Sequence, residues 1–428
     1  MAEIGEILQS FQRFGVHLGL KRIQKLLADL GNPHHAVPVI HVAGTNGKGS
    51  VCAYLSAVLT EAGYRVGRYT SPHLIDWTER ICLNEQPISM EALRELLLLV
   101  KAAIPEDCDD SPTQFEVITA AAWLYFEEQQ VDVAVVEVGL GGRLDATNVA
   151  SQPLVSIITS LSREHWQNLG PTLADIAREK AGILKAGCPA VVGQFPAEAE
   201  VVVKQRIQEL DCLTVWVKPA KWIEEGWAEY EGIKYPLTLL GDIQLSNSAI
   251  AIATLQILRS QGWKISDDVI ASGMAKTTWQ GRLQWTHWRN HRLLIDGAHN
   301  PAAAVALRQY VDTLNTPVTW VMGILSTKDH ADIFEAILRP GDRVYLVPVP
   351  DHSSADPDAL AIIAKNCCPK IGDCRTFPNL EAGLQAATSS NLAEPSNRLI
   401  VLCGSLYLVG YFLKQNRLDI KENLTKPD

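Results

Sequence analysis

The chain has 428 residues, of which 47% are hydrophobic and 20% charged, and its formal net charge is −10 at pH 7. This length exceeds what one hydrophobic core usually supports, so we expect two or more domains. The negative charge argues against nucleic acid or an anionic membrane as a partner, and the apolar runs are too short to cross a bilayer. Nine cysteines do not make a small disulfide scaffold in a chain of this size, and the N-terminus lacks the pattern of a signal peptide. We therefore expect a globular protein of the cytoplasm.

Strands and helices alternate along the first half of the chain. Apolar, β-branched runs predict strands at residues 37–42, 131–138, 154–159 and 190–192, and residues 50–62 predict a helix. The run VDVAVVEV is apolar on both faces, as in a parallel strand covered by helices on both sides. The alternation predicts an α/β fold built on a P-loop-type, doubly wound and mostly parallel sheet.

The pattern changes in the middle of the chain and then resumes. Short runs rich in Trp and Tyr at about residues 212–240 predict a small β excursion, followed by a helix at residues 244–261. We place the first domain at residues 1–288. New strands at residues 293–295, 318–322, 343–347 and 399–403 predict a second, smaller Rossmann-like α/β domain at residues 289–415. Residues 286–291 are expected to form the linker, and residues 416–428 a polar tail that frays.

The stretch HVAGTNGKGS follows the first predicted strand and precedes the first predicted helix. Its glycines, Gly44, Gly47 and Gly49, allow a tight turn that brings backbone N–H groups close to phosphate oxygens, and the helix N-terminus favours anions. Lys48 can neutralise terminal phosphates, and Ser50 can reach a Mg²⁺. The usual P-loop places the hydroxyl directly after the lysine, whereas Gly49 intervenes here. The stretch predicts a phosphate-binding loop, with a plain glycine-rich turn as the alternative.

Two polar residues follow neighbouring predicted strands. Glu137 lies near the carboxyl end of VDVAVVEV, where a ligand of a phosphate-bound Mg²⁺ is expected; an ion pair with Arg143 is the alternative. His165 follows the strand at residues 154–159, at the sheet edge where open α/β folds bind ligands. It is a candidate metal ligand, with a surface or capping histidine as the alternative.

A lysine lies on the apolar face of a predicted helix. Residues 172–186 predict a helix that ends at Gly187, and Lys180 shares the face of Ile176 and Leu184. A buried lysine must lose its charge, find a partner or be modified, for example by CO₂ to a carbamate that ligates a metal. Extension of the side chain to solvent is the alternative.

Polar residues also follow three strands of the second domain: Asp296 with His299, Lys328 with Asp329, and Ser405. Because the carboxyl ends of parallel strands meet at one edge, these residues predict a face that closes over a ligand. Ordinary turn chemistry is the alternative.

Several motifs occur together and in a fixed order: HVAGTNGKGS, SPHL, TQFEVITA, VEVGLGGRLDATN, REKAGI, DGAHNP and GSLYLVG. With them the chain, from about Leu18 to Tyr411, resembles the folylpolyglutamate synthase / dihydrofolate synthase family, which shares its fold with Mur-type amide ligases. Mur-type ligases usually place Ser or Thr directly after the loop lysine, so Gly49 favours the folate branch. The resemblance implies an ATP-binding, Mur-ligase-like central domain and a C-terminal domain of the glutamate-ligase type.

The resemblance implies an ATP-dependent ligase that forms amides. ATP and a folate carboxylate would give an acyl phosphate, which the amine of L-glutamate attacks. The expected acceptors are dihydropteroate, tetrahydrofolates, or both. We expect no nucleic-acid or membrane partner, and a monomer. Such chemistry requires positioning, charge neutralisation and exclusion of water.

The resemblance also assigns residues by motif. ATP would be bound by Gly44, Thr45, Asn46, Gly47, Lys48, Gly49, Ser50, Asn247, Arg282 and Asp296. Two Mg²⁺ ions would be held by Ser50, Ser71, Glu137, His165 and a carbamylated Lys180. The pterin would lie against Thr113, Gln114, Phe115, Glu116, Leu144, Asp145 and Ala146. The catalytic group would comprise Lys48, Lys180, His165, Asp296 and His299.

Three positions depart from the family's pattern. The family often has Asp-His where this chain has Glu164 before His165. It often has His-Gln before the adenine-binding asparagine, whereas Asp-Ile-Gln precedes Asn247 here. It often has Gly-Arg-x-Glu where Gln284 follows Arg282.

Two other functions remain open at this point. A Mur-type ligase acting on a nucleotide-linked cell-wall precursor would keep the chemistry and change the substrate. A non-catalytic ATP-binding regulator would keep the fold and lose the metal ligands. The presence of Glu137, His165 and Lys180 argues against the regulator.

Overall fold

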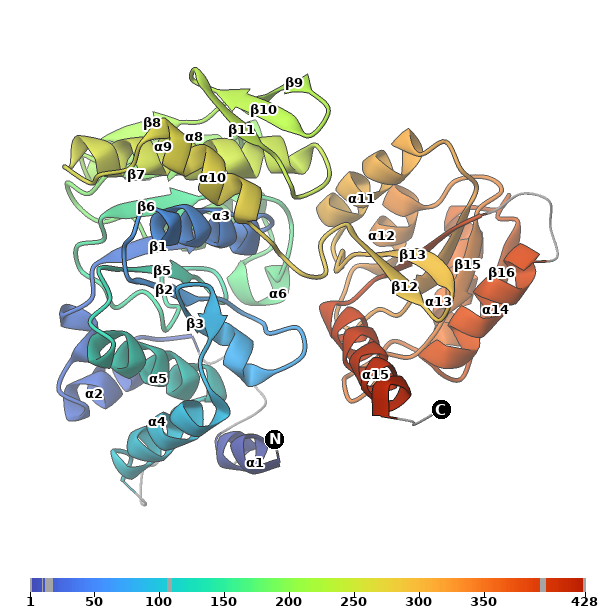
Figure 1. Ribbon diagram of the computed structural model, residues 1–428, viewed down its shortest axis with the longest axis horizontal. Helices are drawn as coiled ribbons and strands as arrows, with labels where there is room; N and C mark the ends of the chain where they lie inside the picture. The colour runs from blue at the N-terminus through green and yellow to red at the C-terminus, as the bar shows by residue number, and fades with distance from the viewer. Residues whose placement is uncertain (1, 10, 12–17, 106–109, 393–397, 426–428) are drawn as a thin grey trace. The chain divides into compact units, whose positions relative to one another are not determined.

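The computed structural model describes residues 2–9, 11, 18–105, 110–392 and 398–425 (Figure 1). The chain divides into two compact units. The first comprises Met1–Thr238 and Ile243–Thr278, and the second comprises Leu239–Asp242 and Trp279–Asp428. Each unit is an α/β structure with its own sheet, so the fold class predicted from the sequence is confirmed.

The sheet of the first unit has eight strands in the order β4-β3-β2-β5-β1-β6-β7-β8. The strands are β1 (Val39–Ala43), β2 (Val66–Tyr69), β3 (Ile81–Leu83), β4 (Gln86–Pro87), β5 (Val133–Glu137), β6 (Val155–Ile158), β7 (Ala190–Val192) and β8 (Thr214–Trp216). From β2 to β8 all pairs are parallel, whereas β3 and β4 join antiparallel. Every residue of β1 and β5 is buried, as expected for parallel strands covered on both faces.

Helices cover both faces of this sheet (Figure 1). The helix α3 (Lys48–Glu61) packs against α9 (Ile243–Ser260) and α10 (Asp267–Lys276). A separate group contains α1 (Ala2–Gln9), α2 (Lys21–Asp29), α4 (Met90–Ala102) and α5 (Gln114–Glu128), whose apolar residues share one core. The remaining helices are α6 (Trp166–Leu169), α7 (Leu173–Ala181) and α8 (Ala197–Glu209), with 3₁₀ turns η1 (Pro33–His35) and η2 (Trp77–Arg80). The carboxyl ends of the three central strands, β5, β1 and β6, therefore lie between two layers of helices.

The expected β excursion is present but begins later than the sequence suggested. Strand β8 belongs to the edge of the main sheet. The excursion is a separate three-stranded antiparallel sheet of β9 (Lys221–Glu224), β10 (Trp227–Tyr230) and β11 (Ile233–Pro236).

The sheet of the second unit has the order β12-β13-β17-β14-β15-β16. Its strands are β12 (Gln284–Trp288), β13 (His291–Ile295), β14 (Val318–Met322), β15 (Arg343–Leu346), β16 (Asp373–Thr376) and β17 (Leu399–Cys403). Its helices are α11 (Pro301–Thr313), α12 (His330–Ile337), α13 (Pro357–Cys367), α14 (Leu380–Leu392) and α15 (Leu406–Thr425). Trp320 and Phe334 lie at the centre of its core, and the buried Asp342 accepts hydrogen bonds from Trp320 Nε1 at 3.0 Å and Arg308 Nη1 at 2.7 Å.

Two local predictions were wrong. Residues 286–291 are not a linker, because β12 and β13 form an antiparallel hairpin in which Trp288 pairs with His291. The helix that carries Lys180 does not reach Gly187, because Gly182 caps α7 after Ala181. Helix α15 continues into the predicted polar tail as far as Thr425, and residues 426–428 lie outside the described part of the chain. Within the described residues, no helix combines the length and the apolar character needed to span a membrane.

Candidate active site

The predicted phosphate loop connects β1 to α3. Gly47 precedes the first residue of α3 with φ of 89°, in the left-handed region that glycine adopts without strain. A Cβ atom at Gly47 would lie 2.3 Å from Asn247 Oδ1, so a larger residue would also displace the asparagine. The loop therefore has the turn and the close packing that a phosphate cradle requires.

The loop is held in place by the segment that follows β6. The N–H of Thr45 donates to Ser160 O at 2.7 Å, and its hydroxyl donates to Ser162 O at 3.1 Å. The N–H of Asn46 donates to Ser160 Oγ at 3.0 Å, while Thr159 Oγ1 donates to Asn46 O at 2.7 Å. Thr45 and Asn46, both predicted to bind ATP, thus fix the loop to the central strands.

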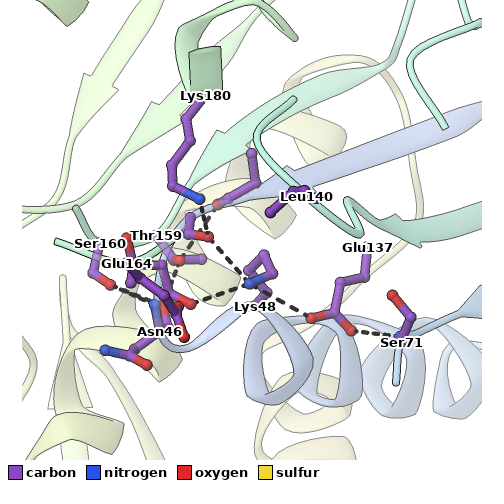
Figure 2. A network of polar contacts seen from close by, with 12 residues as sticks. Asn46, Lys48, Ser71, Glu137, Leu140, Thr159, Ser160, Glu164 and Lys180 are labelled. Carbon is purple, nitrogen blue, oxygen red and sulfur yellow. Dashed lines mark hydrogen bonds and ion pairs between the residues drawn. The ribbon is translucent and has the colours of Figure 1, made fainter. Parts of the chain in front are cut away.

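Two ammonium groups meet at the same carbonyl oxygen of this loop (Figure 2). Lys48 Nζ lies 3.1 Å from the carbonyl oxygens of Gly44 and Thr45, and Lys180 Nζ lies 2.7 Å from that of Gly44. The side chain of Lys180 is buried, with 6% of the residue exposed, so it does not extend to solvent. The structure therefore brings together the loop lysine and the lysine on the apolar face of α7.

Burial changes the chemistry of Lys180. Desolvation, followed by the nearby charge of Lys48, lowers the pKa of Lys180 to about 7. Glu164 and Asp145 act in the opposite direction but do not cancel this shift. A substantial fraction of the amine is therefore neutral near pH 7, and a neutral amine is a nucleophile that can react with CO₂.

Glu137 ends β5 beside the loop. Its Oε2 accepts a hydrogen bond from the N–H of Ser71 at 3.1 Å, and its Oε1 lies 4.0 Å from Lys48 Nζ. Arg143 pairs with Glu179 instead, at 2.8 Å, so the alternative ion pair between Glu137 and Arg143 is not formed. Glu137 is 5% exposed, and this buried carboxylate faces the loop that we expect to hold phosphates (Figure 2).

These groups match the ligand preference of Mg²⁺. Across the described ranges, no three His, Cys, Asp or Glu side chains gather closely enough to form a metal centre of their own. Mg²⁺ is commonly held by one or two carboxylates together with substrate phosphates, so a single carboxylate with hydroxyl groups is sufficient. Glu137 beside Ser71 fits such a shared site, and a carbamate on Lys180 would add a second anionic ligand.

His165 lies in the loop after β6, as predicted. Its backbone is left-handed, with φ of 51°, and it precedes α6 without making a side-chain capping hydrogen bond. Its Nε2 lies 3.9 Å from Glu164 Oε1, and its side chain is 44% exposed whereas that of Glu164 is 11% exposed. The histidine side chain is thus accessible to a ligand, while Glu164 is directed inward near Lys180.

Gln244 is a site residue that sequence reasoning missed. Gln244 and Asn247 lie one turn apart on α9, and Asn247 Nδ2 donates to Gln244 Oε1 at 3.0 Å. Gln244 Nε2 donates to Ser50 Oγ at 3.4 Å, so one carboxamide joins the loop hydroxyl to the expected adenine ligand. The contact between Gln244 and Ser50 joins two helices that are far apart in the sequence, so no local pattern identifies it.

Arg282, Asp296 and His299 belong to the second unit. Asp296 follows β13 and is buried; its carboxylate accepts hydrogen bonds from the N–H groups of Leu283 at 2.8 Å and Ala298 at 2.7 Å. Burial raises the pKa of Asp296, and the charge of Arg282 opposes this shift. His299 Nδ1 lies 2.7 Å from Gly297 O, which fixes the orientation of the ring. Asp296 therefore organises the turn on which Arg282 and His299 are presented.

The residues predicted to contact a pterin fall into two groups. In the first, Thr113 and Glu116 form the capping box of α5, and Glu116 also pairs with Arg22 at 3.1 Å. Gln114 donates to Leu8 O at 2.8 Å. Phe115 approaches the loop after β5, where its ring lies against the backbone of Gly139.

The second group lies in the loop after β5. Asp145 is buried, and it accepts hydrogen bonds from Leu140 N at 2.8 Å and from the hydroxyl and N–H of Thr147 at 2.6 and 3.0 Å. Burial raises the pKa of Asp145 despite these donors. Ala146 is buried, and Leu144 O accepts a hydrogen bond from the N–H of Gly19 at 3.3 Å. Asp145 thus shapes this loop from within.

A glycine-rich loop that joins a strand to a helix and carries a lysine is typical of proteins that bind the phosphates of a nucleotide. Residues 42–255 match the model of the Mur ligase middle domain, and residues 281–415 match that of the dihydrofolate synthetase C-terminal domain. The Dihydrofolate synthetase of Saccharomyces cerevisiae is 35% identical over 427 residues, covering 93% of this chain and 98% of the relative. The Dihydrofolate synthase/folylpolyglutamate synthase of Bacillus subtilis is 33% identical over 428 residues, covering 94% and 96%.

A solved structure agrees with these relatives. The Folylpolyglutamate Synthase of Mycobacterium tuberculosis, complexed with ADP and AMPPCP, superposes with a TM-score of 0.85 at 30% identity, covering 97% of both chains. The chain belongs to the dihydrofolate synthase / folylpolyglutamate synthase family, and the resemblance stated from its motifs is confirmed.

Proposed function

We propose that this chain is an ATP-dependent ligase that adds L-glutamate to dihydropteroate and to reduced folates through an acyl phosphate. The observation that carries the proposal is the convergence of Lys48 and Lys180 on the carbonyl oxygen of Gly44, beside the carboxylate of Glu137. The names of the relatives and the nucleotides in the solved structure support it.

The first unit would activate the carboxylate of the acceptor. Backbone N–H groups of the loop and the charge of Lys48 bind the triphosphate and orient its terminal phosphate. Ser50, Ser71, Glu137 and His165 would hold Mg²⁺ at two sites, where it would neutralise charge on the transferred phosphoryl group. The residues named for the pterin, above all Phe115 and the loop shaped by Asp145, would position the acceptor carboxylate.

Lys180 would serve as a carbamate. Its ammonium first loses one proton. The neutral amine then attacks CO₂, a C–N bond forms while one C=O π bond of CO₂ opens onto oxygen, and a second proton leaves, so the ammonium beside Gly44 O becomes a carbamate anion. The low pKa of this buried lysine supports the step, because only the unprotonated amine reacts. The anion would complete the ligands of the second Mg²⁺ together with His165.

The second unit would supply further contacts to the nucleotide. Arg282 and Asp296 would contact the nucleotide together with Asn247 of the first unit, and His299 would lie beside it. Exclusion of water would protect the acyl phosphate until the amine of L-glutamate attacks it. We expect the protein to act as a monomer in the cytoplasm.

A side-by-side acceptor assay tests the proposal. The protein is incubated with ATP, Mg²⁺ and L-glutamate, and with either dihydropteroate or tetrahydrofolate, while ADP release is measured. We expect both acceptors to stimulate turnover. Stimulation by neither acceptor would contradict the proposal, and stimulation by one alone would reduce it to a single activity.

The other two functions are distinguished by the same assay. The match to the Mur ligase middle domain covers only part of the chain, whereas the C-terminal match is to dihydrofolate synthetase. A Mur-type ligase would respond to a cell-wall precursor and to neither folate. A non-catalytic regulator would bind ATP and release no ADP with any acceptor.

A further inference from the structure

Two of the nine cysteines precede neighbouring strands of the first unit. Cys188 stands two residues before β7, and Cys212 stands two residues before β8. These strands pair in parallel, with Ala190 opposite Thr214. Counting back two residues along each strand places Cys188 opposite Cys212, and residues opposite each other in parallel strands point to the same face of the sheet.

Backbone hydrogen bonds carry this register back past the cysteines. Ala190 N donates to Leu213 O, and Gly187 N donates to Leu210 O, each at 2.9 Å. Both bonds join residues with the same separation along the chain, so the register is unchanged between them. Adjacent strands lie about 4.8 Å apart, which is within the Cα–Cα range of about 4.4–6.8 Å that a disulfide bridges.

The two cysteines also meet at one carbonyl oxygen. The thiol of Cys212 donates to Lys185 O at 3.3 Å, and the N–H of Cys188 donates to the same oxygen at 3.1 Å. Both cysteines are free thiols in the structure. Cys212 is 9% exposed and belongs to the same apolar core as Ala190, whereas Cys188 is only partly buried. Cys188 is therefore the accessible thiol and Cys212 the sheltered one.

The surroundings affect how readily these thiols ionise. Burial raises the pKa of both thiols, while the charge of Lys185 opposes this shift at Cys188 and that of Arg206 opposes it at Cys212. The thiolate is the form that attacks a disulfide. Because both pKa values remain raised, an exchange experiment needs a mildly alkaline solution.

We propose that Cys188 and Cys212 are a reversible modification site, at which a low-molecular-weight disulfide oxidises the folded protein to an intramolecular disulfide. The thiolate of Cys188 attacks one sulfur of the oxidant, whose S–S bond breaks, and one half leaves as a thiolate. The thiolate of Cys212 then attacks Cys188 Sγ, and the second half leaves as a thiolate. The two cysteines thereby lose two protons and two electrons, and the oxidant becomes two thiols.

The new bond would attach the connection between α7 and β7 to the start of β8. It would close residues 188–212 into a loop that contains β7 and α8, and a closed loop restricts the unfolded chain. In the cytoplasm, where we expect this protein, most such disulfides are transient and respond to oxidants. The site does not depend on the proposed ligase function.

Thiol exchange in the folded protein tests the proposal. Wild-type protein is equilibrated without denaturant in mixtures of reduced and oxidised glutathione at about pH 8.5, since thiolates carry the exchange. Acid quenching, alkylation and digestion are followed by mass spectrometry. We expect the peptides that carry Cys188 and Cys212 to be joined with the loss of two hydrogens, and dithiothreitol to separate them.

Single substitutions separate the roles of the two thiols. Cys212→Ser blocks the second step, so glutathione should remain attached to Cys188. In Cys188→Ser, the sheltered Cys212 should take up glutathione about tenfold more slowly than Cys188 does in Cys212→Ser. The matched control is Cys374→Ser, which removes a partly buried thiol from the second unit and should leave the joined peptides unchanged.

Three results would overturn the proposal. One is glutathione that stays on Cys188 of the wild-type protein without any joined peptides. Another is joining of Cys188 to Cys212 that occurs only in urea, because the bond would then belong to the unfolded chain. The third concerns thermal unfolding: the oxidised wild-type protein should unfold at a higher temperature than equally treated Cys188→Ser, and a lower temperature would show that the bond strains the native register. The ligase assay decides the proposed function separately.

Discussion

Lys180 is the residue on which the proposed chemistry depends most. Lys180→Ala removes both the amine at Gly44 O and the carbamate that we propose, so ADP release should fall by about a hundredfold or more. Added acetate should restore part of the activity by supplying carboxylate oxygens in the space left by the side chain. The control is Lys185→Ala, which removes a neighbouring, partly buried lysine. Full activity of Lys180→Ala without acetate would show that this lysine is only structural.

The same residue predicts how stability depends on pH. The pKa of Lys180 is about 7 in the folded protein, and it returns to about 10.4 in the unfolded chain. Between these values the unfolded chain binds more protons, so this lysine makes the free energy of unfolding rise with pH, by at most about 1.4 kcal/mol per pH unit. We expect urea unfolding at pH 7, 8 and 9, without CO₂ or metal, to show that the free energy of unfolding of the wild-type protein rises with pH relative to that of Lys180→Met. Parallel pH profiles would contradict the assigned pKa.

Among the elements, the loop after β5 and the end of α7 depend on each other. The N–H of Arg143 donates to Glu179 O at 2.7 Å, and a Cβ on Gly142 would lie 2.9 Å from that oxygen and 3.2 Å from Lys180 O. Gly142→Ala should therefore push the loop from α7, reduce stability by about 1–3 kcal/mol and impair activity. Denaturant unfolding measures the first effect and ADP release the second. Gly19→Ala is the control, because nothing lies within 4 Å of its Cβ position, and equal behaviour of the two variants would refute the coupling.

Elements also differ in how far the sequence predicts them. The phosphate loop and the burial of Lys180 follow from local patterns, because glycine spacing and helical periodicity act over a few residues. The polar sequence of residues 286–291 predicts a linker, whereas the structure has a hairpin there, because β12 is an edge strand and Trp288 is the one buried residue among these six. Gln244 could not be recognised alone, because its partner Ser50 lies on another helix. Long-range contacts of this kind have no local sequence signal.

At the scale of the whole molecule, the residues assigned to the nucleotide are divided between the two units. Asn247 belongs to the first, whereas Arg282 and Asp296 belong to the second. AMPPCP at about 100 times its dissociation constant should stabilise the protein by about 2.7 kcal/mol, and thermal unfolding of both units should shift upward. Arg282→Ala should weaken the shift of the second unit, whereas Arg289→Ala, which removes an exposed ion pair with Glu381, should not. A second unit that unfolds independently of the nucleotide would contradict this assignment.

The position of β1 in its sheet has a consequence for synthesis of the protein. Its two hydrogen-bonded neighbours, β5 and β6, are encoded far downstream, and β6 ends only at Ile158. Until β5 and β6 have been synthesised, β1 has no hydrogen-bonded neighbour on either side. The glycine-rich turn after β1 therefore lacks the strands that position it. Lys180 is synthesised later still. A nascent chain arrested before these residues emerge should therefore be unable to capture a nucleotide, although the whole signature motif has already left the exit tunnel.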